Sequence, residues 1–382
     1  MTSQQSLFDH QDTLRALNEN VPLAEKLGNV HRALQAQCPF IDRVAVAIYD
    51  PKSDLLKTYL HSSGEDNNPL RHYQSRLADA PSLQAIVEQR RPRLVNDLAI
   101  FHQGEQLHTQ RIAAQGYAAS YTLPMFLNEA FFGFVFFNSY TKDVFGDGVL
   151  HYLDLVGHLI SLMIINEQTS MRTLLATVKM AHDMTHHRDT ETGAHIDRMS
   201  RYARLIAIHL APTYKFDDHF IENVFLFSPL HDIGKIAISD EILHKRGKLD
   251  ENERHIMQTH ARKGREIIDS MLADHGLETF ENIDILRNIA EYHHETPNGN
   301  GYPRGLKGRE IPLEARITAV ADVFDALTSK RPYKEAWSND EAFAMLQRLA
   351  GEQLDRHCVE ALMAQRDEVE AIQHAFAEDP LG

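Results

Sequence analysis

The feature that most constrains this chain is the hexapeptide Leu-His-Asp-Ile-Gly-Lys at residues 230–235. His231 stands directly before Asp232, and adjacent donors of these kinds suit a site in which two metal ions lie side by side. An imidazole nitrogen binds one ion, while the two oxygens of a carboxylate can bridge both. Lys235 follows one helical turn after His231, so it can lie on the same face. A lone His-Asp pair is more often surface chemistry, so its meaning depends on the rest of the C-terminal half.

Metal-type residues recur in a definite order after residue 185. They are Glu191, His195, His231, Asp232, His260, His293, His294 and Asp322. Glu191 and His195 are four residues apart and would project from one face of a helix. Asp250 and Glu253 predict a capping box that opens a helix containing His260. Asp322 falls in the predicted helix 313–327. Several helices that each contribute one or two nitrogen or oxygen donors are how helical bundles build multi-metal sites.

Length and charge limit the remaining classes of protein. A chain of 382 residues is too long for one ordinary core, so two domains are expected. The formal net charge of −15 repels nucleic acid, so DNA and RNA are not expected partners. An anionic substrate would need local cations or metal ions. The two cysteines, Cys38 and Cys358, exclude a disulfide framework and indicate a reducing cytoplasm. The apolar stretch 153–165 is too short to span a bilayer, so no membrane association is expected.

The N-terminal half alternates helical and strand patterns. We predict a helix from residue 13 to residue 34, strands at 43–49 and 55–61, and a helix at 80–89. A short strand at 93–95, a hairpin of 121–127 with 130–138, and a helix from 148 complete this half. This order indicates an α+β sandwich with an antiparallel sheet. The sandwich is similar to GAF-type sensor domains, which implies an unknown small ligand.

Two features of this half have two interpretations each. Six phenylalanines in the second hairpin could line a ligand pocket or simply form core: Phe126, Phe131, Phe132, Phe134, Phe136 and Phe137. The last helix continues with apolar residues at three- and four-residue steps. They are Met171, Leu174, Val178 and Ala181. This pattern is typical either of a signalling coiled coil in a parallel homodimer or of an amphipathic helix packed on its own domain.

Several ordered motifs of the C-terminal half together resemble the HD-GYP family, a branch of the HD metal-dependent phosphohydrolases. They are His231-Asp232-Ile233-Gly234-Lys235, His293-His294-Glu295 and Gly301-Tyr302-Pro303. Arg188-Asp189, Thr192-Gly193 and His195 match the opening of the family pattern. Ala321-Asp322, Asp325-Ala326-Leu327 and Arg331-Pro332-Tyr333-Lys334 match its close. The likeness covers residues 188–333, and the family's usual Asp-Gly turn reads Asn298-Gly299 here.

The resemblance implies a multidomain chain. Residues 1–146 would form a GAF-like sensor domain, 147–186 a linker helix, and 187–382 an all-α HD-GYP catalytic domain. The family's metal ligands fall on His195, His231, Asp232, His260, His293, His294 and Asp322, with Asp232 as the bridging carboxylate. Glu191 matches the extra carboxylate of members that hold a third ion. Asp325, one turn from Asp322, competes as a ligand, but the match favours Asp322. A ligand set without thiolate suits iron or manganese.

The resemblance also implies roles around these ions. Lys235 would assist the leaving 3′-oxygen, and Arg331 with Lys334 would hold the substrate phosphates. Gly301 and Tyr302 would shape the substrate site, on a loop that also contacts diguanylate cyclase partners. The implied activity is hydrolysis of cyclic di-GMP to pGpG or GMP in the cytoplasm, controlled by the sensor domain. Two alternatives remain open: a catalytically silent HD-GYP module that signals by protein contacts, and a hydrolase of another cyclic dinucleotide such as cyclic GMP-AMP.

Overall fold

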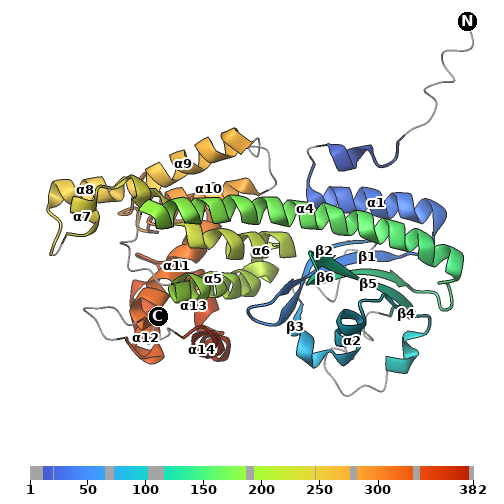
Figure 1. Ribbon diagram of the computed structural model, residues 1–382. Helices are drawn as coiled ribbons and strands as arrows, with labels where there is room; N and C mark the ends of the chain where they lie inside the picture. The colour runs from blue at the N-terminus through green and yellow to red at the C-terminus, as the bar shows by residue number, and fades with distance from the viewer. Residues whose placement is uncertain are drawn as a thin grey trace, which may run out of the picture. The chain divides into compact units, whose positions relative to one another are not determined.

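The chain divides into two compact units, Met1–Met171 and Arg172–Gly382, in the computed structural model (Figure 1). The described residues are 12–19, 21–64, 73–101, 116–185, 193–245, 247–275, 282–329 and 336–377. The division falls inside the long helix α4 (Asp147–Thr185), so the two units share this helix. The domain boundaries expected from the sequence therefore stay a prediction.

A six-stranded antiparallel sheet forms the centre of the first unit. Its strands follow the order β3-β2-β1-β6-β5-β4. They are β1 (Arg43–Asp50), β2 (Leu55–Ser63), β3 (Gln74–Arg76), β4 (Arg93–Val95), β5 (Ala119–Leu127) and β6 (Ala130–Ser139). Two local features account for this pairing. Apolar residues alternate along β1. The turn of the β5–β6 hairpin is Asn128-Glu129, and both residues have positive φ.

Side chains alternate between the two faces of the sheet along each strand, and both faces carry apolar side chains. Helices cover both faces. On one face, α1 (Leu23–Gln37) and the first part of α4 bury a core that includes Val46 and Phe137. On the other face, α2 (Pro81–Gln89), preceded by the short helix η3 (Leu77–Asp79), packs against Ala47 and Phe134. The predicted α+β sandwich is therefore confirmed (Figure 1).

Phenylalanines of the β5–β6 hairpin contribute to the core on both faces of the sheet. Phe132 and Phe137 lie in the core under α1 and α4, and Phe134 lies in the core under α2. Phe131 and Phe136 are partly buried against Phe134. These five side chains are thus accounted for by packing, as the core interpretation of the hairpin expects.

One sequence prediction about this unit is wrong in detail, and one strand was missed. The helix expected from residue 13 to residue 34 is interrupted, since a short helix η2 (Arg15–Asn18) precedes α1, which begins at Leu23 after Pro22. Proline is favoured at the start of a helix and disfavoured inside one, so Pro22 marks this boundary. Strand β3 was missed, because its three residues, Gln-Ser-Arg, carry no apolar alternation.

The apolar part of helix α4 is longer than the stretch 153–165 identified from the sequence. The stretch Asp147–Met171 has a mean hydropathy of 1.7 and meets the length and composition of a membrane span, which corrects the expectation based on residues 153–165 alone. Its inner face supplies Leu153, Ile160 and Ile164 to the core of the first unit. Leu155 and Leu162 are exposed on the opposite face. Met171 is buried, and the side chains of Leu174, Val178 and Ala181 lie outside the described residues.

The described part of the second unit is helical, which confirms the all-α prediction. Its helices are α5 (Gly193–Tyr214), α6 (Asp218–Phe227), α7 (Asp240–Leu243), α8 (Glu251–Gln258), α9 (His260–His275), α10 (Ile283–Tyr292), α11 (Leu313–Thr328), α12 (Asn339–Leu349), α13 (Arg356–Met363) and α14 (Arg366–Ala375). Short 3₁₀ turns connect some of them: η5 (Ser228–Leu230), η6 (Ile233–Ala237) and η7 (Gly308–Glu310). Helices α5 and α11 pack together through Tyr202 and Phe324, whose ring centroids are 5.2 Å apart.

The predicted capping box at the start of α8 is confirmed. The Asp250 side chain accepts from the backbone N–H of Glu253, and the Glu253 side chain accepts from the backbone N–H of Asp250. The helix is shorter than expected, because it ends at Gln258 and a new helix, α9, begins at His260. His260 therefore lies at a helix start and not within the helix that Asp250 opens.

Candidate metal centre

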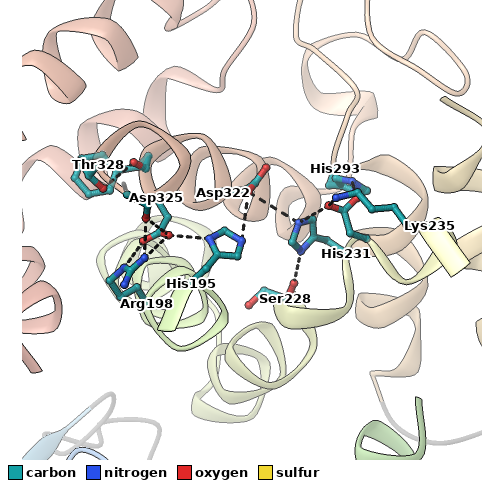
Figure 2. A network of polar contacts seen from close by, with 12 residues as sticks. His195, Arg198, Ser228, His231, Lys235, His293, Asp322, Asp325 and Thr328 are labelled. Atoms are coloured by element: carbon teal, nitrogen blue, oxygen red, sulfur yellow. Dashed lines mark hydrogen bonds and ion pairs between the residues drawn. The ribbon is translucent and has the colours of Figure 1, made fainter. Parts of the chain in front are cut away.

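Five segments of the second unit carry the predicted donors. His195 lies in the first turn of α5, and His231 with Asp232 lies between η5 and η6. His260 begins α9, His293 and His294 follow α10, and Asp322 lies in α11. Figure 2 shows His195, His231, His293 and Asp322 turned toward one region between these helices. Glu191 lies outside the described residues, so its place in the centre stays a prediction.

The donors form two groups, each with ligand atoms that lie within 4.8 Å of one another. One group is His195, His231 and Asp322, and the other is Asp232, His260, His293 and His294. In the first group, Asp322 Oδ1 lies 3.9 Å from His195 Nε2 and 4.0 Å from His231 Nε2. Such spacing leaves room for a cation between donors, since metal–ligand bonds are about 2.0–2.2 Å.

The carboxylate of Asp232 connects the two groups. Its Oδ1 lies 3.1 Å from His260 Nε2 and 3.5 Å from His293 Nε2, both in the second group. Its Oδ2 lies 3.3 Å from His231 Nε2, in the first group. Each oxygen thus faces a different set of imidazoles, which is the arrangement of a carboxylate that bridges two ions.

Backbone carbonyls orient three of the imidazoles. The Nδ1 atoms of His231, His260 and His293 lie 2.7–2.9 Å from the carbonyl oxygens of Ser228, Met257 and Ile289. A carbonyl oxygen only accepts, so Nδ1 carries the proton and donates it. In the neutral ring, Nε2 then holds a lone pair directed at the centre, which is the form that binds a metal ion.

Unsatisfied acceptors show that this arrangement fits a cation. His260 Nε2 and Asp232 Oδ1 are 3.1 Å apart and buried, and neither has a hydrogen-bond partner among the described residues. His293 Nε2 is likewise buried without a hydrogen-bond partner among these residues. Two acceptors this close without a proton between them repel each other, and buried polar atoms are normally paired. A metal ion held by these atoms would remove the repulsion and satisfy them.

The electrostatics of the centre favour the ligand form of Asp232, His293 and His294. Burial opposes the charged form of Asp232, but His231 and Lys235 outweigh it and hold the pKa of this carboxyl well below its ordinary value. Lys235 Nζ lies 2.7 Å from Asp232 Oδ2. Burial also lowers the pKa of His293, and it lowers that of His294 well below the ordinary value, with His293 adding to the effect. An ionised Asp232 beside His293 and His294, whose protonation is opposed by burial, suits the binding of a divalent cation.

A glycine fixes the approach of η6 to α9. A Cβ atom at Gly234 would lie 1.8 Å from the carbonyl oxygen of His260 and 2.5 Å from the backbone nitrogen of Gly264. Only glycine permits this contact, which brings the segment of Asp232 against the start of α9. The Gly in the Leu-His-Asp-Ile-Gly-Lys hexapeptide therefore has a steric role in assembling the centre.

The loop after His294 is packed beside the centre, with Gly301 and Tyr302 in it. A Cβ atom at Gly301 would lie 2.4 Å from the backbone nitrogen of Thr296. The Tyr302 ring lies 4.7 Å from the His294 ring, and the Tyr302 N–H donates to the His294 carbonyl at 3.2 Å. The other predicted substrate residues, Arg331 and Lys334, lie outside the described residues.

Glu295 holds the far end of this loop, a role that the sequence did not reveal. Its carboxylate accepts three backbone N–H groups, from Arg304 and Gly305 at Oε1 and from Leu306 at Oε2, at 2.6–3.1 Å. It is almost fully buried. Its position next to His293-His294 in the motif was the available signal, but that position does not say whether the carboxylate binds an ion or the backbone.

Asp325 faces away from the candidate ions. It is fully buried, and its Oδ2 lies 2.7 Å from His195 Nδ1, on the side of the ring opposite to Asp322 (Figure 2). Arg198 donates from Nε to Oδ1 at 2.7 Å and from Nη2 to Oδ2 at 3.0 Å, and the Ser329 hydroxyl also donates to Oδ2. Of the two aspartates that compete as ligand in α11, Asp322 thus faces the centre.

Comparisons with known proteins agree with this geometry. Residues 182–358 match the model of the HD domain. The cyclic di-GMP phosphodiesterase response regulator RpfG of Xanthomonas campestris pv. campestris is 44% identical over 191 residues, 50% of this chain and 48% of that protein. The 3'3'-cGAMP-specific phosphodiesterase 2 of Vibrio cholerae is 42% identical over 185 residues, 48% of this chain and 33% of that protein. A cyclic di-GMP phosphodiesterase of Thermotoga maritima is 37% identical over 199 residues, 51% of this chain and 50% of that protein.

These matches concern one part of longer proteins, since the chain spans half or less of the length of the three relatives. Among solved structures, a GAF domain/HD domain protein from Geobacter sulfurreducens is similar with a TM-score of 0.32 and 14% identity, over 39% of this chain and 95% of that chain. A score this low carries no argument about fold or function. The family match and the sequence relatives carry that argument. This chain carries an HD domain at residues 182–358, of the kind found in proteins named as cyclic-dinucleotide phosphodiesterases.

Proposed function

We propose that the second unit is a metal-dependent phosphodiesterase that opens cyclic di-GMP to pGpG or, in two cuts, to GMP. The observation that carries this proposal is Asp232, whose two oxygens face two separate groups of imidazole donors. The names of the relatives support the choice of substrate. The first unit, GAF-like in the order of its strands and helices, would bind an unknown small ligand and control turnover.

Two divalent ions suit the described donors. His195, His231 and Asp322 would hold one, His260, His293 and His294 would hold the other, and Asp232 would bind both. When bound, such ions supply Lewis acidity: they activate water at neutral pH and neutralise the charge that develops on the phosphate. Glu191 would add a ligand for a third ion. The mixed imidazole and carboxylate set favours iron, with manganese as the alternative.

The chain's own side chains would bind and orient the substrate. Lys235 lies at the edge of the centre with its ammonium group on Asp232, and its side chain is partly exposed. It can turn from that carboxylate to the leaving 3′-oxygen and offset its negative charge. Tyr302, beside His294, offers an aromatic face to a guanine base. Arg331 and Lys334 would hold the phosphates, which resolves the conflict between an anionic substrate and an acidic protein.

The proposal extends to partners and location. The protein would act in the cytoplasm, without DNA, RNA or membrane as a partner, in line with its two buried free cysteines. A homodimer would form through the segment 147–186, which includes the helix α4. The loop of Gly301 and Tyr302 would contact diguanylate cyclases.

Metal and product analysis of the full chain tests this function. We expect anaerobically purified protein to contain at least two iron or manganese ions per chain and to convert cyclic di-GMP to pGpG or GMP. His293→Ala should lose one ion and turnover. His244→Ala is the matched control, since this partly exposed histidine of the same unit lies outside both groups and should change neither.

Three other outcomes have distinct meanings. Faster turnover of 3'3'-cGAMP than of cyclic di-GMP would assign the substrate named for the Vibrio cholerae relative. Bound metal without turnover of any cyclic dinucleotide would reject the enzyme. Absence of transition metal and of turnover after reconstitution would favour the silent signalling module.

A further inference from the structure

His195 differs from the other oriented imidazoles in the partner of its Nδ1 atom. His231, His260 and His293 have a backbone carbonyl there, whereas His195 has the carboxylate of Asp325 at 2.7 Å. A charged carboxylate makes an imidazole a stronger electron donor than a neutral carbonyl does, and it fixes the ring orientation more firmly.

The structure keeps this carboxylate charged and in place. Asp325 is fully buried, and a buried carboxylate is stable when its oxygens accept hydrogen bonds and face a cation. Arg198 contacts both oxygens, and Ser329 adds a donor. Arg198 also donates to the carbonyl of Phe376, which ties α5 to the end of α14. Arg198 thus offsets the charge of Asp325 on the side away from the ions. Among the metal donors in the described part of the chain, Asp325 contacts His195 through Nδ1.

We propose that Asp325, held by Arg198, is a positioning residue that acts through His195 and strengthens the ion site of His195, His231 and Asp322. This inference rests on the proposed metal-dependent function and adds an asymmetry to it. The two ions would differ in affinity because, among the described residues, a carboxylate supports a donor imidazole of the first ion and none is seen behind those of the second.

Chelator competition on the full chain measures both affinities. Asp325→Asn keeps the size of the side chain but removes its charge, and we expect it to weaken one ion about 10- to 100-fold. The second ion should change less than about threefold. The same substitution in a His195→Ala background should have no further effect, because groups that act through one ligand are not additive. A merely structural role would weaken both ions and would persist in that background.

Two further variants make the result decisive. Asp355→Asn is the matched control: Asp355 is also largely buried and paired with an arginine, Arg316, at 2.7 Å in the same unit, and its substitution should leave both affinities unchanged. If Asp325→Asn does not fold, Arg198→Lys keeps the positive charge but loses the two-point contact, and it should weaken the same ion several-fold.

The outcomes separate this inference from the proposed function. No effect of either variant, an equal effect on both ions, or full persistence in His195→Ala would overturn the role of Asp325 while leaving the phosphodiesterase intact. If the wild-type protein binds no transition metal, both proposals fail together.

Discussion

Replacing Gly234 by alanine tests how the hexapeptide assembles the centre. The added Cβ would lie 1.8 Å from the carbonyl oxygen of His260 and 2.8 Å from its carbonyl carbon. All the nearest atoms are backbone, so no side chain can turn aside. The segment of Asp232 and the start of α9 would have to separate by about 1.2 Å to bring the closest contact to 3.0 Å. Such overpacking costs about 1–3 kcal/mol of stability.

The same shift would disturb metal binding. His260 and Asp232 would move apart by a similar distance, whereas metal–ligand bonds tolerate changes of about 0.2 Å. We expect Gly234→Ala to weaken the ion of the His260 group at least tenfold and to lower turnover about 100-fold. Chelator competition measures the metal affinity, turnover of cyclic di-GMP measures the rate, and thermal unfolding of the metal-free protein measures the loss of stability.

A second glycine provides the control. Gly148, in the first turn of α4, has nothing within 4 Å of a built Cβ, so Gly148→Ala should leave metal affinity unchanged and the helix no less stable. Wild-type metal affinity and unfolding temperature in Gly234→Ala would refute the reasoning, because the close contact between η6 and α9 would then have no consequence.

Three more substitutions test separate parts of the account. Lys235→Ala should lower turnover 100-fold or more and metal content little, since Lys235 is assigned to the leaving oxygen; parallel loss of both in metal analysis and kinetics would make its role structural. Glu191→Ala should lower the metal count by about one while the remaining pair stays loaded, and unchanged stoichiometry would exclude Glu191 as a ligand. Burial raises the pKa of Glu314, so its charged form destabilises the fold; Glu314→Gln should raise the unfolding temperature at neutral pH, with the gain lost as the pH falls below about 4.5. Equal gains at pH 4 and pH 8 would contradict that assignment.

Much of the fold was predictable because local patterns agreed with the final packing. The apolar alternation in β1 and the turn before β2 predicted that hairpin, and the Asp250 capping box predicted the start of α8. The errors fall where tertiary contacts decide. The helix break before His260 has no glycine or proline to signal it, and the break lies where the backbone of Gly234 packs against that of His260.

The candidate centre was predictable as a set of residues but not as a geometry. The order of the motifs selected the donors, yet nothing in their spacing shows that Asp232 stands between two groups of imidazoles. Asp322 and Asp325 are one helical turn apart, and both are carboxylates beside His195. Asp322 faces His195 Nε2, whereas Asp325 contacts His195 Nδ1. These opposite contacts distinguish the candidate ligand, Asp322, from its supporting residue, Asp325.

The central claim is that Asp232 lies between two ions, and anomalous diffraction from crystals of the metal-loaded protein measures this directly. The account predicts two adjacent peaks, one within about 2.3 Å of His195, His231 and Asp322 and the other within about 2.3 Å of His260, His293 and His294. One oxygen of Asp232 should contact each peak, or one oxygen should contact both. A single peak, or peaks that Asp232 does not touch, would contradict it.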